Sequence, residues 1–308
     1  MARIAFSIAV WLLICVRLSL ADSISIASFN IRIFSDNSRT NAELEQIADR
    51  LQQFDLIAVQ EANDNEVVER TLAILNGRDL PFAAIVSGDV GRNSADERYV
   101  FFWRTDRVIP LSDLGFFPDS QDVFIREPYA VSFRAGTFDF TLVTIHAIYG
   151  DTVGDRRAEA GHLGEVVSWV LGADPVERDV LLLGDFNLPS GDRGFDGLRS
   201  FLSPVFATDS QTTIADNDLD NIWLDLKACT EWTGTFGIDR FDETVFGGDD
   251  KAASLAVSDH RPIWASFSTD GLDDDGLAAP TPVAYESWAA VKAGQGSPKG
   301  IDFIVPTK

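Results

Sequence analysis

The chain has 308 residues, 45% hydrophobic and 11% aromatic, which is ample for one large globular core or two small ones. Its formal net charge is −23, with 48 acidic against 25 basic residues. Such a charge repels polyanions at long range and excludes recognition of nucleic acid through overall charge. If the protein acts on nucleic acid or phospholipid, it must do so through a local site with divalent cations.

Residues 1–21 have the pattern of a secretory signal peptide. Arg3 supplies a positive start, residues 4–16 form an apolar run, and residues 19–21 provide a small-x-small cleavage site. The run is too short for a membrane anchor, because Arg17 interrupts it before about 20 apolar residues are reached. We therefore expect a secreted or periplasmic protein that has no membrane segment after cleavage. Cleavage removes two arginines and leaves Cys229 as the single cysteine, so no intramolecular disulfide can form. We interpret Cys229 as a small buried residue.

The elements predicted along the rest of the chain indicate an α/β (α+β) protein. Residues 23–33 alternate and are β-branched, which predicts a strand, and residues 41–54 place four apolar side chains on one helical face. A second helical pattern over 66–77 stops at Gly77. Residues 155–172 predict a third helix, with His162 in its middle as a surface or satisfied core histidine. Further strand-like runs cover 55–61, 82–87, 98–104, 108–114, 129–136, 138–147, 180–183, 220–227 and 261–268. Strands that alternate with helices early and then form hairpin-like runs indicate layers with large mixed sheets.

The chain divides into three parts on this basis. Residues 1–21 are the signal peptide and residues 22–269 form one catalytic domain. Residues 270–308 are rich in Asp, Gly, Pro and Ala and are expected to be an acidic tail or linker. Nothing in the sequence points to a stable protein partner, and we expect a monomer.

Polar side chains follow several of the predicted strands at the point where each strand ends. They are Asn30 and Arg32 in SFNIR, Glu61 in VQE, His146 in IHA, Asp185 and Asn187 in GDFN, and Asp259 and His260 in SDH. One such residue means little, but five apolar strands that end in oxygen or imidazole groups suggest one convergent site. Two of the three histidines in the chain belong to this set.

The chemistry of this set points to phosphoryl transfer with a hard cation. Carboxylates and amides without thiolates suit Mg²⁺, Mn²⁺ or Ca²⁺ and suit zinc poorly. A metal held by Glu61 and its neighbours can polarise a phosphoryl oxygen and stabilise a leaving oxyanion. Asp185 or one histidine can take the proton of an attacking water, and the other histidine can stabilise the transition state or protonate the leaving group.

The ordered series SFNIR, VQE, IHA, GDFN and SDH, over roughly residues 23–268, resembles the endonuclease/exonuclease/phosphatase superfamily. The stretches GRNSADERYVFFWR (91–104) and REPYAVSF (126–133) resemble its deoxyribonuclease I branch. The resemblance implies a deoxyribonuclease I-like four-layer sandwich of two mixed β-sheets flanked by helices. It also implies roles for single residues. The metal and the scissile phosphate would be surrounded by Asn30, Glu61, Asp185, Asn187 and Asp259. The catalytic imidazoles would be His146, oriented by Glu97, and His260, oriented by Asp220. Phosphate oxygens would be held by Arg32 and Arg126.

Some placements have ordinary alternatives. The segment Asp185–Asn187 can be an Asx turn, Glu97 can form a surface ion pair with Arg98, Asp220 can be a turn residue, and Arg126 can cap a loop. Asp122 matches a structural calcium ligand of the family, although the loop before it is shorter here.

The sequence also departs from the family at residues that contact DNA. Where the deoxyribonucleases insert an arginine and a tyrosine into the minor groove, this chain has Asn63 and Ala95, and Asn221 replaces a basic residue. The family's disulfides are missing as well. The catalytic set is complete, but the contacts that hold a duplex are reduced.

Three functions fit these observations. The first is a secreted endonuclease that depends on Mg²⁺ (or Mn²⁺), with Ca²⁺ as a further candidate cation, and hydrolyses DNA to 5′-phosphate ends. The second is a sphingomyelinase-like secreted phosphodiesterase that acts on phospholipid or a small phosphoester; an exposed aromatic hairpin would favour it, and none is clear. The third is a non-catalytic binding protein, which would require loss of a histidine or metal carboxylate. The negative charge further predicts that activity requires millimolar divalent cation, which screens repulsion as well as taking part in catalysis.

Overall fold

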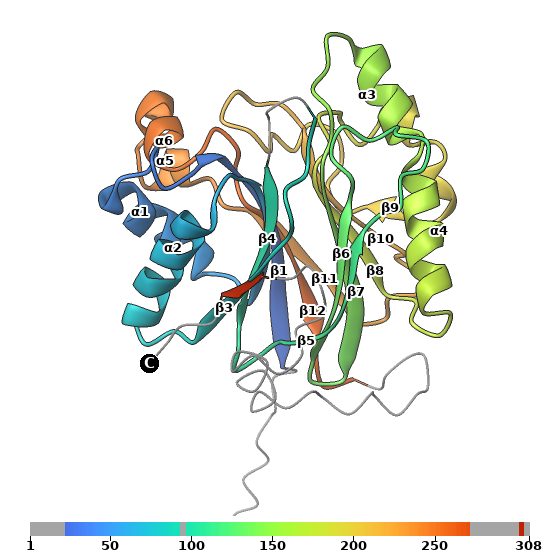
Figure 1. Ribbon diagram of the computed structural model, residues 1–308, viewed down its shortest axis with the longest axis horizontal. Coiled ribbons are helices and arrows are strands. Elements are labelled where there is room, and N and C mark those ends of the chain that lie inside the picture. The colour runs from blue at the N-terminus through green and yellow to red at the C-terminus, as the bar shows by residue number, and fades with distance from the viewer. Residues whose placement is uncertain (1–21, 93–96, 272–301, 305–308) are drawn as a thin grey trace, which may run out of the picture.

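Two β-sheets that pack face to face form the centre of the computed structural model, which describes residues 22–92, 97–271 and 302–304 (Figure 1). The predicted signal peptide, most of the predicted tail and Ala95 lie outside these residues. Within the described ranges, no helix combines the length and apolar character that a membrane crossing requires.

The first sheet has seven strands and the second has six. In spatial order the first contains β11 (Trp232–Ile238), β12 (Ile263–Ser268), β1 (Ser23–Phe34), β2 (Leu56–Ala62), β4 (Arg98–Arg104), β3 (Phe82–Val86) and β13 (Asp302–Ile304). The second contains β5 (Ile109–Phe116), β6 (Tyr129–Ala135), β7 (Phe138–His146), β8 (Val180–Asp185), β10 (Asp220–Leu224) and β9 (Ser203–Pro204). Both sheets are mixed, because β1 and β2 are parallel, as are β7 and β8, whereas the other paired strands are antiparallel.

Helices cover the outer face of each sheet (Figure 1). The first sheet carries α1 (Asn41–Leu51), α2 (Asn65–Gly77), α5 (Phe241–Thr244) and α6 (Asp250–Ala256). The second carries α3 (Val153–Ala160), α4 (Leu163–Ala173) and the 3₁₀ turns η1 (Arg193–Phe195) and η2 (Leu198–Ser200). The predicted four-layer α/β sandwich is therefore confirmed.

Alternation along the strands explains the layers. In β7, for example, Phe138, Phe140 and Leu142 face the other sheet, whereas Val143 and Ile145 face the helices. The core between the sheets is aromatic: the rings of Phe138 and Phe140 stack with centroids 4.5 Å apart, and Phe138 also stacks on Phe267 of the opposite sheet at 5.2 Å. These contacts hold the two sheets, and hence their ends, in fixed positions.

The predicted helix over 155–172 is wrong in its continuity. The structure has two helices, α3 and α4, which are separated at Gly161 and His162. Gly161 ends α3, and His162 occupies the N-cap position of α4 without a capping hydrogen bond. Its Nδ1 instead lies 2.9 Å from Glu165 Oε1, which makes it a partly exposed, satisfied histidine. Strand β11 and helices α5 and α6 had no predicted counterpart. Three residues of the predicted tail form β13, which extends the first sheet beside β3.

Candidate active site

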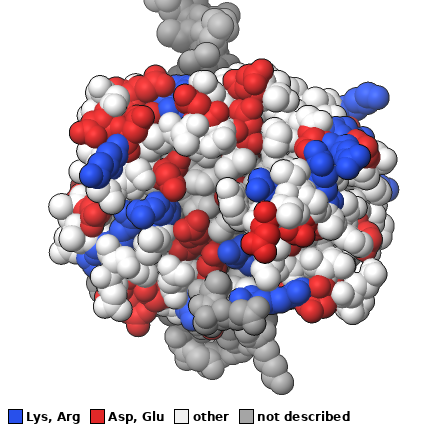
Figure 2. All heavy atoms as spheres, turned by 90° about the horizontal axis from the view of Figure 1, so that it is seen from above, with Lys and Arg blue, Asp and Glu red and all other residues white. Residues whose placement is uncertain are grey.

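The carboxyl ends of both parallel strand pairs meet at one end of the sandwich and line a pocket of about 460 Å³. This end faces the viewer in Figure 2, where acidic and basic side chains both gather around the middle of the surface. The lining residues are Glu61, Glu97, Arg126, His146, Tyr149, Asp185, Asn187, Thr213, Ala215, Asn217, Leu219, Asp259 and His260. Eight of the predicted site residues thus line one pocket.

Strand register places three predicted site residues side by side. His146 is paired with Asp185 in the parallel β7–β8 ladder, and Asp185 is paired with Asp220 in the antiparallel β8–β10 ladder. Gly184, directly before Asp185, has φ +145°, and a Cβ there would lie 2.0 Å from the Ile145 carbonyl oxygen. Only glycine allows this close approach of β8 to β7. The glycine that ends the buried strand therefore brings the Asp185 tip next to His146.

His146 is nearly buried and held by three groups. Its Nδ1 lies 2.7 Å from Glu97 Oε2, and its backbone N–H donates to the Tyr99 hydroxyl at 3.1 Å. Arg126 bridges the same residues, with Nη2 2.8 Å from Glu97 Oε1 and Nη1 donating to the His146 carbonyl oxygen at 3.3 Å. Burial alone would lower the pKa of His146, but the hydrogen bond and charge of Glu97 outweigh it and raise that pKa. The imidazolium form is favoured.

His260 has an equivalent arrangement on the other side of the pocket. Its Nδ1 lies 2.9 Å from Asp220 Oδ2, and Asp220 is itself buried. Burial alone would lower the pKa of His260, but the charge of Asp220, followed by that of Asp185, raises it to about 10. A carboxylate behind each ring fixes the tautomer, so Nε2 of each imidazole is the atom presented to the pocket.

Asp185 lies between the two imidazoles. Its Oδ2 is 3.7 Å from His146 Nε2 and 3.6 Å from His260 Nε2, and it also accepts a hydrogen bond from Asn30 Nδ2 at 3.1 Å. Its Oδ1 accepts from the Asn187 backbone N–H at 2.9 Å, which is the Asx turn considered as an alternative. The turn and the functional placement coexist, because the turn uses one carboxylate oxygen and aims the other at both histidines.

A hard cation fits the donor set at this end. The Oδ1 atom of Asn30 is buried and has no hydrogen-bond partner within the described part of the chain. Glu61 and Asn187 both line the pocket with left-handed backbone, at φ +65° and +51°. Such backbone is uncommon for residues other than glycine and frequent at functional sites. With the exposed carboxylate of Asp259, these groups supply only oxygen ligands, as Mg²⁺, Mn²⁺ and Ca²⁺ prefer.

Of the remaining predicted residues, some reach the pocket and others do not. Glu97 does not pair with Arg98, which instead binds Asp89 and Asn65. Arg126 lines the pocket, whereas Arg32 is half-buried at the end of β1 and is absent from the lining.

The structure also shows the contacts or burial of three residues that the sequence analysis discussed outside the catalytic set. Asp122 pairs with Arg92, with Oδ1 2.5 Å from Nη2. Asn221 binds the Phe206 backbone, donating to its carbonyl oxygen at 2.8 Å and accepting from its N–H at 3.2 Å. Cys229 is a buried free thiol, as predicted, and burial raises its pKa.

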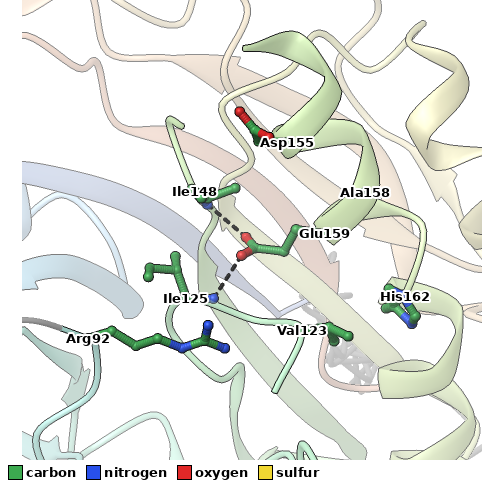
Figure 3. A pocket seen from close by; sticks show the side chains of 8 residues that line it. All are labelled: Arg92, Val123, Ile125, Ile148, Asp155, Ala158, Glu159 and His162. Carbon is green, nitrogen blue, oxygen red and sulfur yellow. Dashed lines mark hydrogen bonds between the residues drawn. The ribbon is translucent and has the colours of Figure 1, made fainter. Parts of the chain in front are cut away.

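Sequence reasoning missed several groups that support or line the site. Figure 3 shows Glu159 of α3, a buried carboxylate that accepts from the Ile125 N–H at 2.8 Å and the Ile148 N–H at 2.7 Å. These residues adjoin Arg126 and follow His146, so one side chain ties together two loops of the site. Arg39 binds four backbone carbonyl groups at the end of β1 and α6. Tyr149 lines the pocket from the loop that follows β7. No local sequence pattern marks these residues, because Arg39 and Glu159 bind backbone groups, which any residue type provides, and some of these lie more than 200 positions away.

Comparison with known proteins identifies the family of the chain. Residues 27–260 match the Endonuclease/Exonuclease/phosphatase family. The chain is 32% identical over 273 residues to a protein named Deoxyribonuclease from Thioalkalivibrio sp. (strain K90mix), covering 83% of this chain and 74% of that protein. It is 29% identical to Deoxyribonuclease-1 of Bos taurus, covering 82% of this chain and 94% of that protein.

Solved structures share the fold at low sequence identity. A family protein from Bacteroides thetaiotaomicron superimposes with a TM-score of 0.56 at 17% identity, covering 81% of this chain and 98% of that one. The 3′ phosphatase NExo from Neisseria, solved with a product DNA hairpin, has a TM-score of 0.56 at 14% identity and covers 80% of this chain and 99% of that one. On the family match, the shared architecture and the convergent site, this chain belongs to the endonuclease/exonuclease/phosphatase family of phosphoester hydrolases.

Proposed function

We propose that the protein is a secreted, divalent-metal-dependent endonuclease that hydrolyses phosphodiester bonds of DNA and leaves 5′-phosphate ends. The observation that carries the chemistry is the position of Asp185 Oδ2, 3.7 and 3.6 Å from the Nε2 atoms of two carboxylate-backed histidines. The names of the similar proteins, deoxyribonucleases from a bacterium and from cattle, support DNA as the substrate.

We assign a role to each group on the basis of this geometry. Raised pKa values favour the imidazolium form of both histidines, so the pocket presents two N–H donors and one carboxylate acceptor between them. Asp185 Oδ2 accepts the proton of the attacking water, whose oxygen forms the new bond to phosphorus. The bond from phosphorus to O3′ breaks, and one imidazolium donates its Nε2 proton to that oxygen. The other imidazolium neutralises charge on the phosphoryl oxygens, so the products are a 3′-hydroxyl and a 5′-phosphate.

Other side chains bind and neutralise the phosphodiester. Arg126 is held by Glu97 and the His146 carbonyl group, which leaves its guanidinium beside the pocket to bind a phosphate oxygen. The groups that would hold Mg²⁺ or Mn²⁺, with Ca²⁺ as a further candidate, are Asn30, Glu61, Asp185, Asn187 and Asp259. When bound, such a cation supplies Lewis acidity and offsets the negative charge of both substrate and pocket.

Cleavage of supercoiled plasmid in Mg²⁺ plus Ca²⁺ tests the proposal. The protein without residues 1–21 is expected to nick the plasmid, and EDTA is expected to abolish nicking. His146→Ala is expected to lower the rate by at least about a hundredfold, in the range found for loss of a general acid or base. His162→Ala is the matched control, because the third histidine lies in the α3–α4 break and pairs with Glu165. Mass spectrometry of a cleaved oligonucleotide identifies which fragment carries the phosphate.

A parallel sphingomyelin assay separates the main alternative. An intact plasmid together with turnover of the lipid would overturn the deoxyribonuclease proposal and favour a lipid phosphodiesterase with the same catalytic groups. Protein that stays inside the producing cells would contradict secretion, and protein in the culture medium that still carries residues 1–21 would contradict cleavage after residue 21.

A further inference from the structure

One aromatic side chain stands at the rim of the catalytic pocket with most of its surface exposed. Tyr149 lies in the loop between β7 and α3, only three residues after His146, and 66% of its surface is exposed. It lines the same pocket as both catalytic histidines and Asp185. Three residues of chain span at most about 11 Å, so the Tyr149 backbone lies within that distance of His146, and both side chains line the pocket that would hold the phosphate.

An arginine packs against one face of this ring and holds it in place. The guanidinium carbon of Arg156 lies 4.5 Å from the ring centroid of Tyr149. Its Nε donates to the Tyr149 carbonyl oxygen at 2.6 Å, and its Nη1 donates to the Asn187 carbonyl oxygen at 3.3 Å. The cation therefore backs the ring and anchors the loop to a residue of the catalytic set.

The loop that carries the ring is itself ordered by local contacts. Thr152 and Asp155 form a capping box at the start of α3, with the Thr152 N–H donating to Asp155 Oδ2 at 2.8 Å. Gly150 has φ +60°, and a Cβ there would lie 2.9 Å from the Asp155 Cβ, so the loop is packed against the helix start. A ring that is fixed before binding loses little conformational entropy when a ligand stacks on it.

We propose that Tyr149, backed by Arg156, is a stacking platform for an unpaired nucleobase next to the scissile phosphate. This inference rests on the proposed function and adds a substrate preference to it. A base within a duplex already has neighbours on both faces, whereas an unpaired base can stack on a side chain without regard to sequence. The platform therefore gives preference to single-stranded or frayed DNA over a fully paired duplex.

Oligonucleotides with and without bases test the platform. The substrates are a single-stranded thymidine 12-mer and a 12-mer of the same backbone with abasic tetrahydrofuran residues, and the readout is kcat/KM for each. Tyr149→Ala is expected to lower kcat/KM on the thymidine oligomer about tenfold, as for loss of one base–aromatic stack, and to change it less than about twofold on the abasic oligomer. Tyr149→Phe keeps the ring and is expected to restore discrimination between the two substrates.

Phe201→Ala provides the control for truncating an exposed aromatic side chain. Phe201 is 39% exposed and lies beside Val180, at the opposite end of β8 from Asp185. If the abasic oligomer is cut too slowly to measure, fluorescence anisotropy of both labelled oligomers with the His146→Ala protein provides the same comparison as a ratio of Kd values.

The outcomes separate this inference from the function on which it rests. Equal losses on both oligomers, or no loss on either, would overturn the platform while leaving the endonuclease in place. If the unsubstituted protein cuts no DNA, the proposed function is wrong and the platform falls with it. A fully paired hairpin adds a second check, because Tyr149→Ala is expected to reduce the preference for the single strand over the hairpin.

Discussion

Asp242 and Arg261 form the most deeply buried ion pair near the site. Their side chains are 2% and 3% exposed, with Arg261 Nη2 2.5 Å from Asp242 Oδ2 and Nε 2.9 Å from Oδ1. The pair joins the start of α5 to the residue after His260. Burial alone would raise the pKa of Asp242, but the hydrogen bonds and charge of Arg261 hold that pKa below its ordinary value.

The lowered pKa sets the direction of a stability change with pH. A carboxylate with a depressed pKa in the folded state stabilises the fold above its unfolded pKa of about 3.9, and this stabilisation is lost as the pH falls through the folded pKa. Asp242→Asn is expected to lower the free energy of unfolding at pH 7 by about 3 to 5 kcal/mol, because Arg261 would remain buried without its counter-ion. The difference between the two proteins is expected to shrink below about pH 4. Urea unfolding at several pH values measures it.

Glu243→Gln is the matched control for Asp242→Asn. Glu243 is the next residue, is 55% exposed and lies 3.8 Å from the same guanidinium. Its removal is expected to change the free energy of unfolding by less than about 1 kcal/mol, as for other exposed ion pairs. Equal effects of the two substitutions would show that burial of the pair has no special weight.

At this scale, the sequence predicted residues whose role follows from their position at a strand end. His146, Asp185 and His260 could be found because each follows an apolar run. Arg39 and Glu159 could not, because their partners lie up to 218 residues away and are backbone groups of any residue type. Tyr149 was missed for a related reason, since its exposure and its contact with Arg156 arise only in the folded loop.

Helix α3 acts on the site through Glu159, which accepts hydrogen bonds from two loops (Figure 3). One loop leads to Arg126 and the other follows His146. Burial raises the pKa of Glu159, while the two backbone donors favour the charged form that accepts both bonds. Glu159 is thus a positioning residue, because its hydrogen bonds go to the backbone of two loops and not to Asp185 or an imidazole.

Glu159→Gln tests this positioning role. The amide retains one acceptor oxygen, so one of the two buried N–H groups loses its partner at a cost of about 1 to 3 kcal/mol. We expect kcat on plasmid or oligonucleotide to fall about tenfold while KM changes less, and hydrogen exchange at Ile125 or Ile148 to accelerate. Glu165→Gln on the exposed side of α4 is the control. Unchanged exchange together with lowered kcat would contradict a role through the loops.

The long elements with strong patterns were predictable. Helix α1 buries the four predicted side chains, Leu44, Ile47, Ala48 and Leu51, because its apolar residues recur at helical spacing. Strand β11 has mostly exposed residues and two glycines, so no alternation marks it, and α6 buries only Ala253. The break between α3 and α4 was missed because the apolar pattern continues across it, while Gly161 and His162 give only a weak stop signal.

The order of strands in the two sheets depends on contacts across the whole chain. Strand β1 pairs with β12, whose residues lie more than 200 positions later, and this pairing brings the SDH segment to the end of β1. Periodicity could indicate mixed sheets but not this order. The resemblance carried by the ordered motifs supplied what local patterns could not, and the family match now supports it.

The net charge of −23 acts against the approach of DNA to the pocket. Basic and acidic side chains are interspersed on the face that contains the site, so the residues that the structure describes form no broad positive surface there to offset this repulsion (Figure 2). An acidic protein and a polyanion attract each other only at short range, where arginine and a bound cation meet the phosphate. At low ionic strength, with a Debye length of about 30 Å, repulsion extends well beyond these contacts.

Salt is therefore expected to accelerate cleavage before it inhibits it. At fixed saturating Mg²⁺, raising NaCl from about 10 to 150 mM should increase kcat/KM on a long oligonucleotide severalfold, because the Debye length falls to about 8 Å. A basic DNA-binding protein would lose affinity over the same range through release of counter-ions. Bis(p-nitrophenyl) phosphate, which carries one negative charge, is the control substrate, and its hydrolysis should change little. A monotonic fall in kcat/KM on DNA would mean that local basic contacts, and not the overall charge, govern the approach of the substrate.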